Sequence, residues 1–419
     1  MAGIYDWSAQ VTREECIALL GDGWHGYELV AVRREPVPSG DGEQVQLVLA
    51  SDGSPGACSA CGQLVDEVHD YSWRYVRDLP LLGASTELVV HRRRLACPDC
   101  GPKLEALSWL HPYARVTRRL AESVARLCAV ASIKHVAEHF ALGWHQVKEI
   151  DKQQLLLKLG PVDLTGVTQI ALDEFAIHKG QSYATVIAEP ATRRILYVAK
   201  GRERASIRPF FEQLGTDVCE RIEAAVMDMW RPFRDEVTEW CPNASIVFDL
   251  FHVLQKYSKD VIDRTRIDIA NQLTHNKPAR KVVKGSKWLL LRARSNLDEH
   301  QRVNLDELLA ANQDLMTVHV LGEDIRELWQ LRNQTKARRF FRDWLARARA
   351  SGITQLARFA DMLEKHLAGI LAHCHYPLST GFLEGMNNKI KVMKRIAYGY
   401  RDLDYFFLKL RAAFPGNPR

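Results

Sequence analysis

The spacing of hydrophobic residues changes several times along the chain. Residues 1–34 are predicted to form a helix followed by a strand, and QVQLVLAS (44–51) also reads as a strand. PVPSGDGEQ, between these two strands, is a turn-rich break. Apparent strands around WRYVRDL and STELVVHRRRLA follow, so residues 44–105 are predicted to form a small β module.

The pattern becomes helical at about residues 116–157. VTRRLAESVARLCAV places apolar residues at helical spacing, and IKHVAEHFALGWHQVKEIDKQQLL reads as helix, short turn at Leu142–Gly143, and helix. This order is typical of a helix-turn-helix. An ordinary helical hairpin with a solvated polar face is the alternative.

From about residue 165 the chain alternates between strands and helices. VTQIALDEFAI, QSYATVIAEP and RRILYVAKG are three strand-like runs, and AAVMDMW and ASIVFDLFHV are two more, with helices around them. This order predicts an α/β fold. Residues 260–370 are helical and rich in charge, and a basic helix begins at about Glu384.

The composition of the chain restricts the possible fold and function only slightly. The chain has 419 residues, which predicts two to four domains, with a net charge of +6 that permits a polyanionic partner. The N-terminus lacks a signal-peptide pattern, and no apolar run reaches the ~18–20 residues that span a bilayer, so we expect a cytoplasmic protein. The nine cysteines, an odd number, argue against a disulfide framework.

Four of the cysteines are arranged as metal ligands. Cys58/Cys61 and Cys97/Cys100 are two Cys-x2-Cys pairs separated by 35 residues. Such pairs bind zinc in zinc ribbons, although this gap exceeds the usual ~15–20 residues. The sequence therefore predicts a structural Zn²⁺ site. His69 and His91 are spare ligands, and two unrelated cysteine pairs are the alternative.

The second helix of the helix-turn-helix has side chains suited to reading DNA. In such motifs the first residues of this helix meet base edges in the major groove. Amide and amine side chains can contact bases, and arginines upstream can contact the phosphate backbone. The candidates are His145, Gln146 and Lys148, with Arg115, Arg118 and Arg119 upstream.

Acidic residues interrupt three of the apolar strands. Asp173, Asp228 and Asp249 lie in IALDEFAI, AVMDMW and IVFDLF. A carboxylate buried in a strand is costly unless it is paired or bound to metal. A strand-end Asp that caps a helix is the alternative for each. Together they suggest the carboxylate cluster that two-metal phosphoryl transfer requires.

A fourth acid begins the basic helix near the end of the chain. Glu384 precedes Lys391 by seven residues, which places both on one helix face. An acid that binds metal beside DNA phosphate suits these basic surroundings, and a solvated helix-start Glu is the alternative. The other basic residues of this helix are Lys389, Lys394 and Arg395.

Taken in order, these motifs resemble the ISL3 family of bacterial insertion-sequence transposases, members of the DDE group. The resemblance rests on CSACG…CPDCG, the helix-turn-helix, LDEFAIHKGQSYATVI, VMDMWRPF, ASIVFDLFHV and PLSTGFLEGMNNKIKVMKRIAYGYRDLDYFFLKL. Matching these segments puts Asp173, Asp228 and Glu384 at the three catalytic acids. Lys391 falls where this group often has Lys or Arg.

The resemblance implies an RNase H-like core with a helical insertion before the last acid, preceded by a zinc-ribbon-like module and a helix-turn-helix. It also implies Mg²⁺ or Mn²⁺, terminal inverted repeats and target DNA as partners, two or more protomers, and work at the bacterial nucleoid. A metal-activated water would cut at the element end, and the freed 3′-OH would attack the target. The predicted domains are 1–43, 44–110 (zinc), 111–160 (helix-turn-helix), 161–270 with 371–419 (catalytic) and 271–370 (insertion).

Several assignments stay open at this point. Glu174 competes with Asp173 as first ligand, because alternation along a strand puts them on opposite faces. Asp249 is an auxiliary acid or a helix-start Asp. Packing or DNA support is the expected role of Trp230 and His252, and His178 and Lys179 either touch DNA or lie in a solvated turn. The alternative functions are a DNA-binding regulator on an inactive scaffold, and a metal nuclease that cuts without joining.

Overall fold

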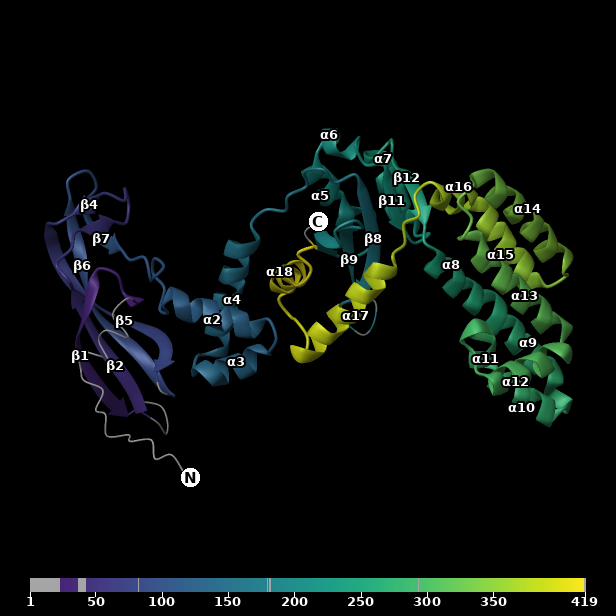
Figure 1. Ribbon diagram of the computed structural model, residues 1–419, viewed down its shortest axis with the longest axis horizontal. Coiled ribbons are helices and arrows are strands. Elements are labelled where there is room, and N and C mark those ends of the chain that lie inside the picture. The colour runs from purple at the N-terminus through teal and green to yellow at the C-terminus, as the bar shows by residue number, and fades with distance from the viewer. Residues whose placement is uncertain are drawn as a thin grey trace, which may run out of the picture. The chain divides into compact units, whose positions relative to one another are not determined.

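The computed structural model describes residues 23–36, 43–81, 83–178, 180, 182–292 and 294–417. The chain divides into two compact units, shown in Figure 1. The first comprises Met1–Gly160 with Ile396–Tyr398, and the second comprises Pro161–Arg395 with Gly399–Arg419. The helix predicted near the N-terminus lies outside the described residues.

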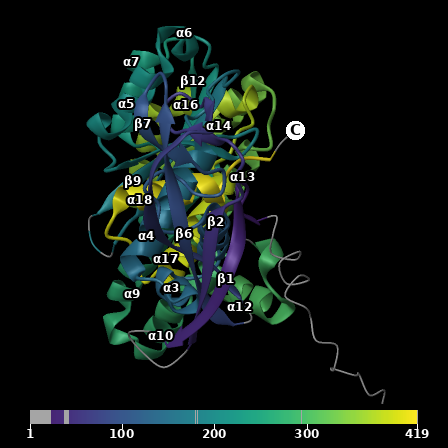
Figure 2. The ribbon, with the colours of Figure 1, turned by 90° about the vertical axis from the view of Figure 1, so that its left-hand side faces the viewer.

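A sheet dominates the first unit, with seven strands among the described residues. The strand order is β1-β2-β6-β7-β3-β4, and β5 pairs with β6 on its other side. Figure 2 shows β1, β2 and β6 running together. The strands are β1 (Tyr27–Pro36), β2 (Glu43–Ser51), β3 (Gly56–Cys58), β4 (Leu64–Val65), β5 (Val68–Leu81), β6 (Ala84–Cys97) and β7 (Gly101–Ala106).

The strand of the predicted N-terminal segment belongs to this sheet. β1 pairs antiparallel with β2, and β2 pairs parallel with β6. Leu47 and Leu49 of β2 share a buried core with Leu88 of β6. The predicted boundary after residue 43 is therefore wrong, because it falls between paired strands. A turn-rich break looks the same in sequence whether it separates domains or joins neighbouring strands.

Three helices follow the sheet in the first unit: α2 (Arg118–Cys128), α3 (Ile133–Phe140) and α4 (Trp144–Leu159). The side chains of Thr117 and Ser132 cap α2 and α3 by accepting a backbone N–H. Ala141 ends α3 in the left-handed conformation, with φ of 49°, and α4 begins three residues later. This tight turn gives the helix-turn-helix that the sequence predicts.

A second sheet forms the centre of the second unit, with strand order β10-β9-β8-β11-β12 among the described residues. The first three strands are antiparallel neighbours, whereas β8, β11 and β12 are parallel. This mixed α/β sheet is consistent with the RNase H-like core expected from the sequence. The strands are β8 (Gln169–Ala176), β9 (Tyr183–Glu189), β10 (Arg194–Lys200), β11 (Ala224–Met227) and β12 (Ser245–Phe248).

Helices cover both faces of this sheet, and a separate cluster of buried apolar residues lies on each face. One cluster joins Leu172 of β8 to Phe210 of α5 (Arg204–Leu214) and Phe233 of α7 (Arg231–Trp240). The other joins Ala171 of β8 to α17 (Gly381–Ile396) and α18 (Leu403–Ala413). The short α6 (Thr216–Cys219) leads into β11.

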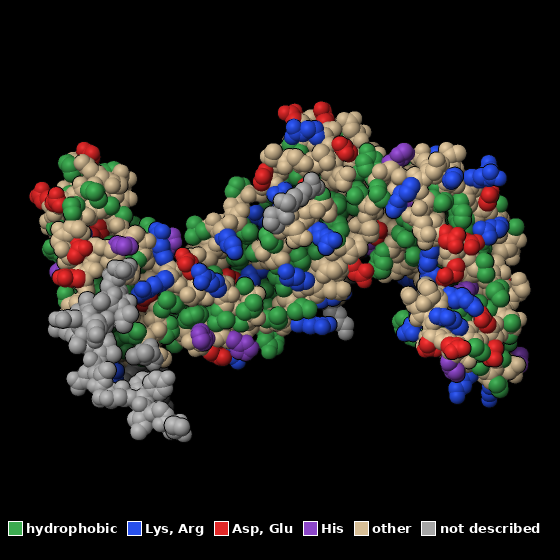
Figure 3. All heavy atoms as spheres, in the orientation of Figure 1, with side chains coloured by type: hydrophobic (Ala, Val, Ile, Leu, Met, Phe, Trp, Pro, Cys, Tyr) green, Lys and Arg blue, Asp and Glu red, His purple; other side chains and the backbone are tan. Residues whose placement is uncertain are grey.

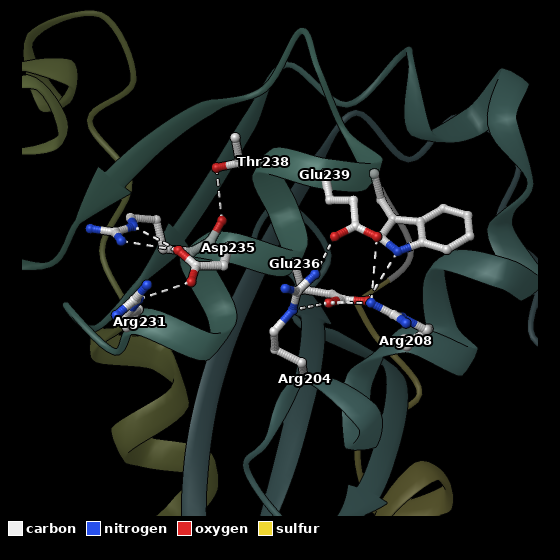
Figure 4. Close-up of polar contacts among 9 residues, drawn as sticks. Arg204, Arg208, Arg231, Asp235, Glu236, Thr238 and Glu239 are labelled. Carbon is white, nitrogen blue, oxygen red and sulfur yellow. Dashed lines mark hydrogen bonds and ion pairs between the residues drawn. The ribbon is translucent and has the colours of Figure 1, made fainter.

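A polar network around one buried carboxylate fastens α7 to α5 (Figure 4). The fully buried carboxylate of Glu236 accepts hydrogen bonds from Arg204 and Arg208 at 2.7 Å and from Trp240 at 3.0 Å. The two guanidinium groups are each 41% exposed, so solvent screens these ion pairs in part. Because α7 begins three residues after Asp228, this network also fixes the chain that leaves β11.

A helical region runs from Leu250, directly after β12, to Cys374. The predicted insertion boundary at 270/271 is therefore wrong, because it cuts α9. Tyr257, which lies before the predicted boundary, already packs with the insertion, because its hydroxyl donates to the carbonyl of Val318. The elements are α8 (Leu250–Tyr257), the π-helix η2 (Ser258–Asp263), α9 (Arg264–Gln272), η3 (Leu273–His275), α10 (Lys277–Gly285), α11 (Lys287–Leu291), η4 (Arg294–Asn296), α12 (Glu299–Ala310), α13 (Gln313–Leu328), α14 (Gln334–Ala350), α15 (Thr354–Lys365), α16 (Leu367–Leu371) and η5 (Ala372–Cys374).

Acidic and basic side chains are mixed on the visible face of the insertion (Figure 3). Within the insertion several basic residues pair with acids, such as Arg347 with Asp324 at 2.7 Å. The visible face is therefore not a surface of a single charge sign. Of the helices that the structure describes, none combines the length and the apolar character that crossing a membrane requires.

Candidate active site

The ends of β8 and β11 bring two predicted acids together. Ala171 pairs with Val226, and Asp173 and Asp228 each come two residues after that pair. Side chains at equivalent positions of neighbouring parallel strands point to the same side of the sheet, and such strands lie ~4.8 Å apart. The two carboxylates are therefore neighbours.

The third predicted acid comes from α17. Leu383, Met386 and Ile390 are buried against the sheet. Glu384 and Lys391 each follow one of these buried residues by one position, so they form an adjacent stripe along the helix. The packing of α17 thus directs this stripe toward the strand ends.

These side chains line one cavity of about 470 Å³. It contains the three predicted acids and Lys391, and four carboxylates in all face two permanent cations. The lining includes Asp173, Glu174, Arg202, Asp228, Trp230, His252, Thr380, Glu384, Asn387 and Lys391. Segments that are far apart in the sequence therefore form a single acidic site.

The acids do not crowd around a single point. Within the described ranges, the four cysteines of the first unit are the group whose ligand atoms all lie within 4.8 Å of one another. Asp173, Asp228 and Glu384 are not such a group. Their carboxylates are therefore spread along the cavity.

Asp173 is held rigidly in a buried position. The side-chain amide of Asn387 donates to its Oδ2 at 2.9 Å, and the backbone N–H of Glu174 donates to its Oδ1 at 2.8 Å. Burial raises the pKa of Asp173 to about 6. The Oδ1 atom of Asn387 is also buried, and it has no hydrogen-bond partner among the described residues. A cation or its bound water would satisfy both groups.

Glu174 has its own partner. Its carboxylate lies 3.2 Å from Arg202, whose guanidinium lies over the rings of Tyr183 and Trp230. The indole N–H of Trp230 donates to the Arg202 carbonyl at 2.9 Å. Since this charge is already compensated, the arrangement favours Asp173 over Glu174 as a metal ligand, and it gives Trp230 a supporting role.

Asp249 lies outside the cavity. Its side chain is only 2% exposed and accepts a 2.5 Å hydrogen bond from Thr380, the residue before α17. It occupies the position before α8, but its side chain does not cap that helix. Asp249 therefore ties the end of β12 to the start of α17, through a residue four positions before Glu384.

The remaining predicted residues of this unit differ in where they lie. His252 lies 3.9 Å from Asp228, and Lys391 lines the cavity. Lys389 and Lys394 instead donate to the carbonyls of Ala413 and Ala176, at 2.8 and 2.6 Å, and so fasten α17 to its neighbours. Exposed positions are occupied by His178 and Arg395, and Lys179 is outside the described residues.

The four cysteines of the first unit form a compact cluster. Their sulfur atoms lie within 4.8 Å of one another. Backbone N–H groups of Cys61 and Ala60 lower the pKa of Cys58 to about 7, whereas the bond with the Cys61 thiol raises the pKa of Cys100 to about 12. A bound dication would offset the repulsion between thiolates held this close together. The long gap between the pairs is occupied by β4, β5 and most of β6.

The spare histidines are not part of this cluster. His69 contacts Asp70 at 2.9 Å, and the ring of His91 lies 4.5 Å from those of both Tyr71 and Trp73.

Most of the predicted DNA-contacting residues of the first unit are accessible. On α4, His145 is exposed and Gln146 and Lys148 are half-buried, while Arg118 is exposed at the start of α2. Arg119 is different, because its guanidinium bonds to the buried carboxylate of Asp78 and lies over Trp24. We therefore omit Arg119 from the proposed DNA contacts.

Sequence reasoning missed Asn387 and Arg202. Asn387 lies three residues after Glu384, so helical spacing predicts that both lie on the cavity side of the helix. Its hydrogen bond to Asp173 could not be predicted from the sequence, because the two residues are 214 positions apart. Arg202 follows a strand in a polar link, where an arginine is unremarkable.

Comparison with known proteins agrees with this architecture. Residues 170–410 match a transposase family model of the ISL3 type, 54–100 match a zinc finger of transposases IS204/IS1001/IS1096/IS1165, and 105–154 match the helix-turn-helix domain of transposase family ISL3. The transposase for insertion sequence element IS1001 of Bordetella parapertussis is 47% identical over 95% of this chain and 97% of its own length. The transposase for IS1557 of Mycobacterium tuberculosis (strain ATCC 25618 / H37Rv) is 26% identical over 74% of each chain.

An α/β domain with an acidic cavity, joined to a zinc ribbon and a helix-turn-helix, defines a DDE-type transposase. The chain belongs to the ISL3 family of insertion-sequence transposases.

The buried carboxyl of Asp173 predicts a pH-dependent gain in stability when its charge is removed. Because the pKa rises from 3.8 to about 6 on folding, its contribution is favourable at low pH and is lost as the pH rises through 6. Asp173→Asn should therefore stabilise the second unit by about 1–3 kcal/mol at pH 8, and by about half as much at pH 5. Calorimetry on zinc-loaded protein without added Mg²⁺ or Mn²⁺ measures this.

The exposed Asp217→Asn on α6 is the matched control and should change stability little at either pH. An Asp173→Asn variant that is less stable than the parent at pH 8, or equally stabilised at both pH values, would contradict this reading of the site.

Proposed function

We propose that this transposase cuts DNA at the ends of its element and joins the freed ends to target DNA, with Asp173, Asp228 and Glu384 as ligands of divalent cations. The observation that supports this most is the meeting of these three acids, from β8, β11 and α17, in one cavity. Four carboxylates against Arg202 and Lys391 leave this cavity negatively charged, and DNA phosphates would be repelled from it without a bound cation.

The donor atoms of the site suit magnesium or manganese. They are carboxylate and amide oxygens, which hard divalent ions prefer. The raised pKa of Asp173 and the unpartnered Oδ1 of Asn387 both indicate a place for positive charge. When bound, such ions supply Lewis-acid stabilisation of the phosphate and a water of lowered pKa.

The protein side chains have distinct roles in this proposal. Asn387 and the Glu174 backbone hold Asp173 in one orientation. Asp228 is oriented by the Met229 N–H at 2.6 Å. Lys391, two turns along α17 from Glu384, contacts a phosphate of the DNA beside the reacting bond.

Two phosphoryl transfers follow in order. In the first, the oxygen of a water bonds to phosphorus at the element end, the bond to the 3′ oxygen breaks, and this oxygen leaves as a 3′-OH. In the second, that 3′-OH attacks a target phosphodiester in line, and the target's own 3′ oxygen leaves. The protein forms no covalent bond to DNA, so no Ser or Tyr nucleophile is assigned.

The first unit provides recognition of the DNA ends. The N-terminal part of α4 presents His145, Gln146 and Lys148 for base and backbone contacts, and Arg118 supports them from α2. We infer that the terminal inverted repeats are the sequences bound, that two or more protomers assemble on them, and that the protein acts in the bacterial cytoplasm at the nucleoid.

Asp228→Asn should abolish cleavage in the presence of Mg²⁺ and leave repeat binding within about twofold. Loss of one metal ligand removes several kcal/mol of charge stabilisation, which corresponds to a rate reduction of about 10³-fold. Strand cleavage and strand transfer on a labelled repeat measure the activity, and an electrophoretic shift measures binding. Asp217→Asn is the control and should cut and join as the parent does.

Cleavage that persists in Asp228→Asn would refute the metal-ligand assignment. Cleavage without any strand transfer by the parent protein would instead identify a nuclease.

Zinc should be bound at one ion per chain, and Cys97→Ser should lower both the zinc content and the affinity for DNA. The loss of one thiolate opens a site that holds together the small β3–β4–β7 end of the sheet. Metal analysis and DNA titration measure the two effects. Cys374→Ser is the matched control, because this cysteine lies in the second unit, and a hydroxyl can also donate to the Leu331 carbonyl and meet the His373 ring as its thiol does. Equal zinc content in both variants would overturn the assignment.

A further inference from the structure

An exposed aromatic row lies on the outer face of β5 in the first unit. Tyr71, Trp73 and Tyr75 alternate along the strand, so they point to the same side, and they are 51%, 57% and 57% exposed. The next residue, Val76, faces the opposite side and is fully buried in the core. Large exposed rings in a continuous row mark an interaction surface.

The rings of this row are held in place before any partner arrives. His91 of β6 lies between two of them, with its ring 4.5 Å from Tyr71 at 12° and 4.5 Å from Trp73 at 31°. Stacked rings lose little conformational freedom on binding, which favours their use as a contact surface.

A cavity of about 470 Å³ opens at the Trp73–Tyr75 end of this row. This volume is within the ~300–1,000 Å³ range of small-molecule sites. Beside the two aromatic residues, its lining includes Arg77, Arg115, Glu87 and Gln146. Gln146 comes from α4, the candidate recognition helix, so this cavity is continuous with the proposed DNA-binding surface of the same unit.

Positive charge predominates in this cavity. Arg74 also lines it, so three guanidinium groups face one carboxylate. Arg74 donates to the carbonyls of Tyr113 and Ala114, and Arg77 donates to those of Phe140 and Ala141. These acceptors are neutral, so they do not cancel the charge of either guanidinium group.

The Nε atoms of Arg74 and Arg77 are buried and have no hydrogen-bond partner within the described part of the chain. The single acid, Glu87, opposes Arg77 and also accepts from Gln46 at 3.0 Å. One carboxylate against three guanidinium groups leaves the cavity with a net positive charge.

We propose that this cavity binds an unpaired nucleotide of the DNA whose duplex part is held by α4. The base lies against Trp73 and Tyr75, its phosphate meets the arginines, and Gln146 offers an amide to the base edge. Aromatic faces bind unpaired bases because paired bases already stack on their neighbours. This inference rests on the proposed function, since α4 brings the DNA to the cavity.

The test compares two DNA probes with the full-length, zinc-loaded protein. One is a forked duplex with about six unpaired nucleotides on each strand, within the ~4–16 nucleotides that such surfaces contact. The other is the blunt duplex with the same paired sequence. Fluorescence anisotropy at fixed salt gives the affinity for each. The parent protein should prefer the fork.

Trp73→Ala should weaken fork binding by about 5- to 100-fold, as expected for loss of one stacked base, and leave blunt-duplex binding unchanged. Trp73→Phe should retain most of the affinity. Trp288→Ala, at an exposed Trp of α11, is the matched control and should bind both probes as the parent does. If Trp73→Ala does not fold, as judged by circular dichroism and zinc content, Tyr75→Ala replaces it.

The remaining outcomes separate this inference from the proposed function. If Trp73→Ala weakened the affinity for fork and blunt duplex equally, the inference would be overturned, because the aromatic row would then contact duplex DNA. No loss for either probe, or no preference of the parent for the fork, would also overturn it while leaving the proposed function intact. A parent protein that binds neither probe would contradict the proposed function itself.

Discussion

The site in the second unit depends on one constraint, the packing of α17 against the sheet edge where β8 and β11 end. The parallel register aligns Asp173 with Asp228, but a two-residue acidic pair becomes a three-acid cavity only if Glu384 is delivered there. Burial of the apolar face of α17 provides the driving force, at ~25 cal/mol per Å² of apolar surface. The Thr380–Asp249 hydrogen bond fixes where that helix starts.

This arrangement concentrates negative charge where the protein alone cannot compensate it. Arg202 pairs with Glu174, so the charge of Asp173 relies on Asn387 and one backbone N–H. The pKa of the Asp173 carboxyl is raised to about 6 because burial outweighs those two bonds and the nearby ring of His252. Proteins keep a destabilising buried charge of this kind mainly at functional sites, where a bound ligand can compensate it. The same reasoning applies to the crowded cysteines of the zinc ribbon.

Sequence patterns were informative where the signal is local. Strand periodicity and cysteine spacing indicated the sheets, the helix-turn-helix and the zinc ribbon, and the motif order indicated the family. Contacts between distant segments were not accessible in this way. Asp173 and Glu174 are equivalent in sequence until the packing shows that Asp173 meets Asn387, and Arg119 looks like a DNA contact until Asp78 is placed beside it. The boundary after residue 43 was wrong for the same reason, since strand pairing is non-local.

The proposed mechanism requires Asp173, Asp228 and Glu384 to bind a shared pair of divalent ions. A crystal structure with Mn²⁺ would locate these ions through their anomalous scattering. We expect two peaks ~3.5–4 Å apart, with oxygens of all three carboxylates within ~2–2.5 Å of one or the other. Peaks coordinated by Glu174 in place of Asp173, or no peak in this cavity with DNA bound, would contradict it.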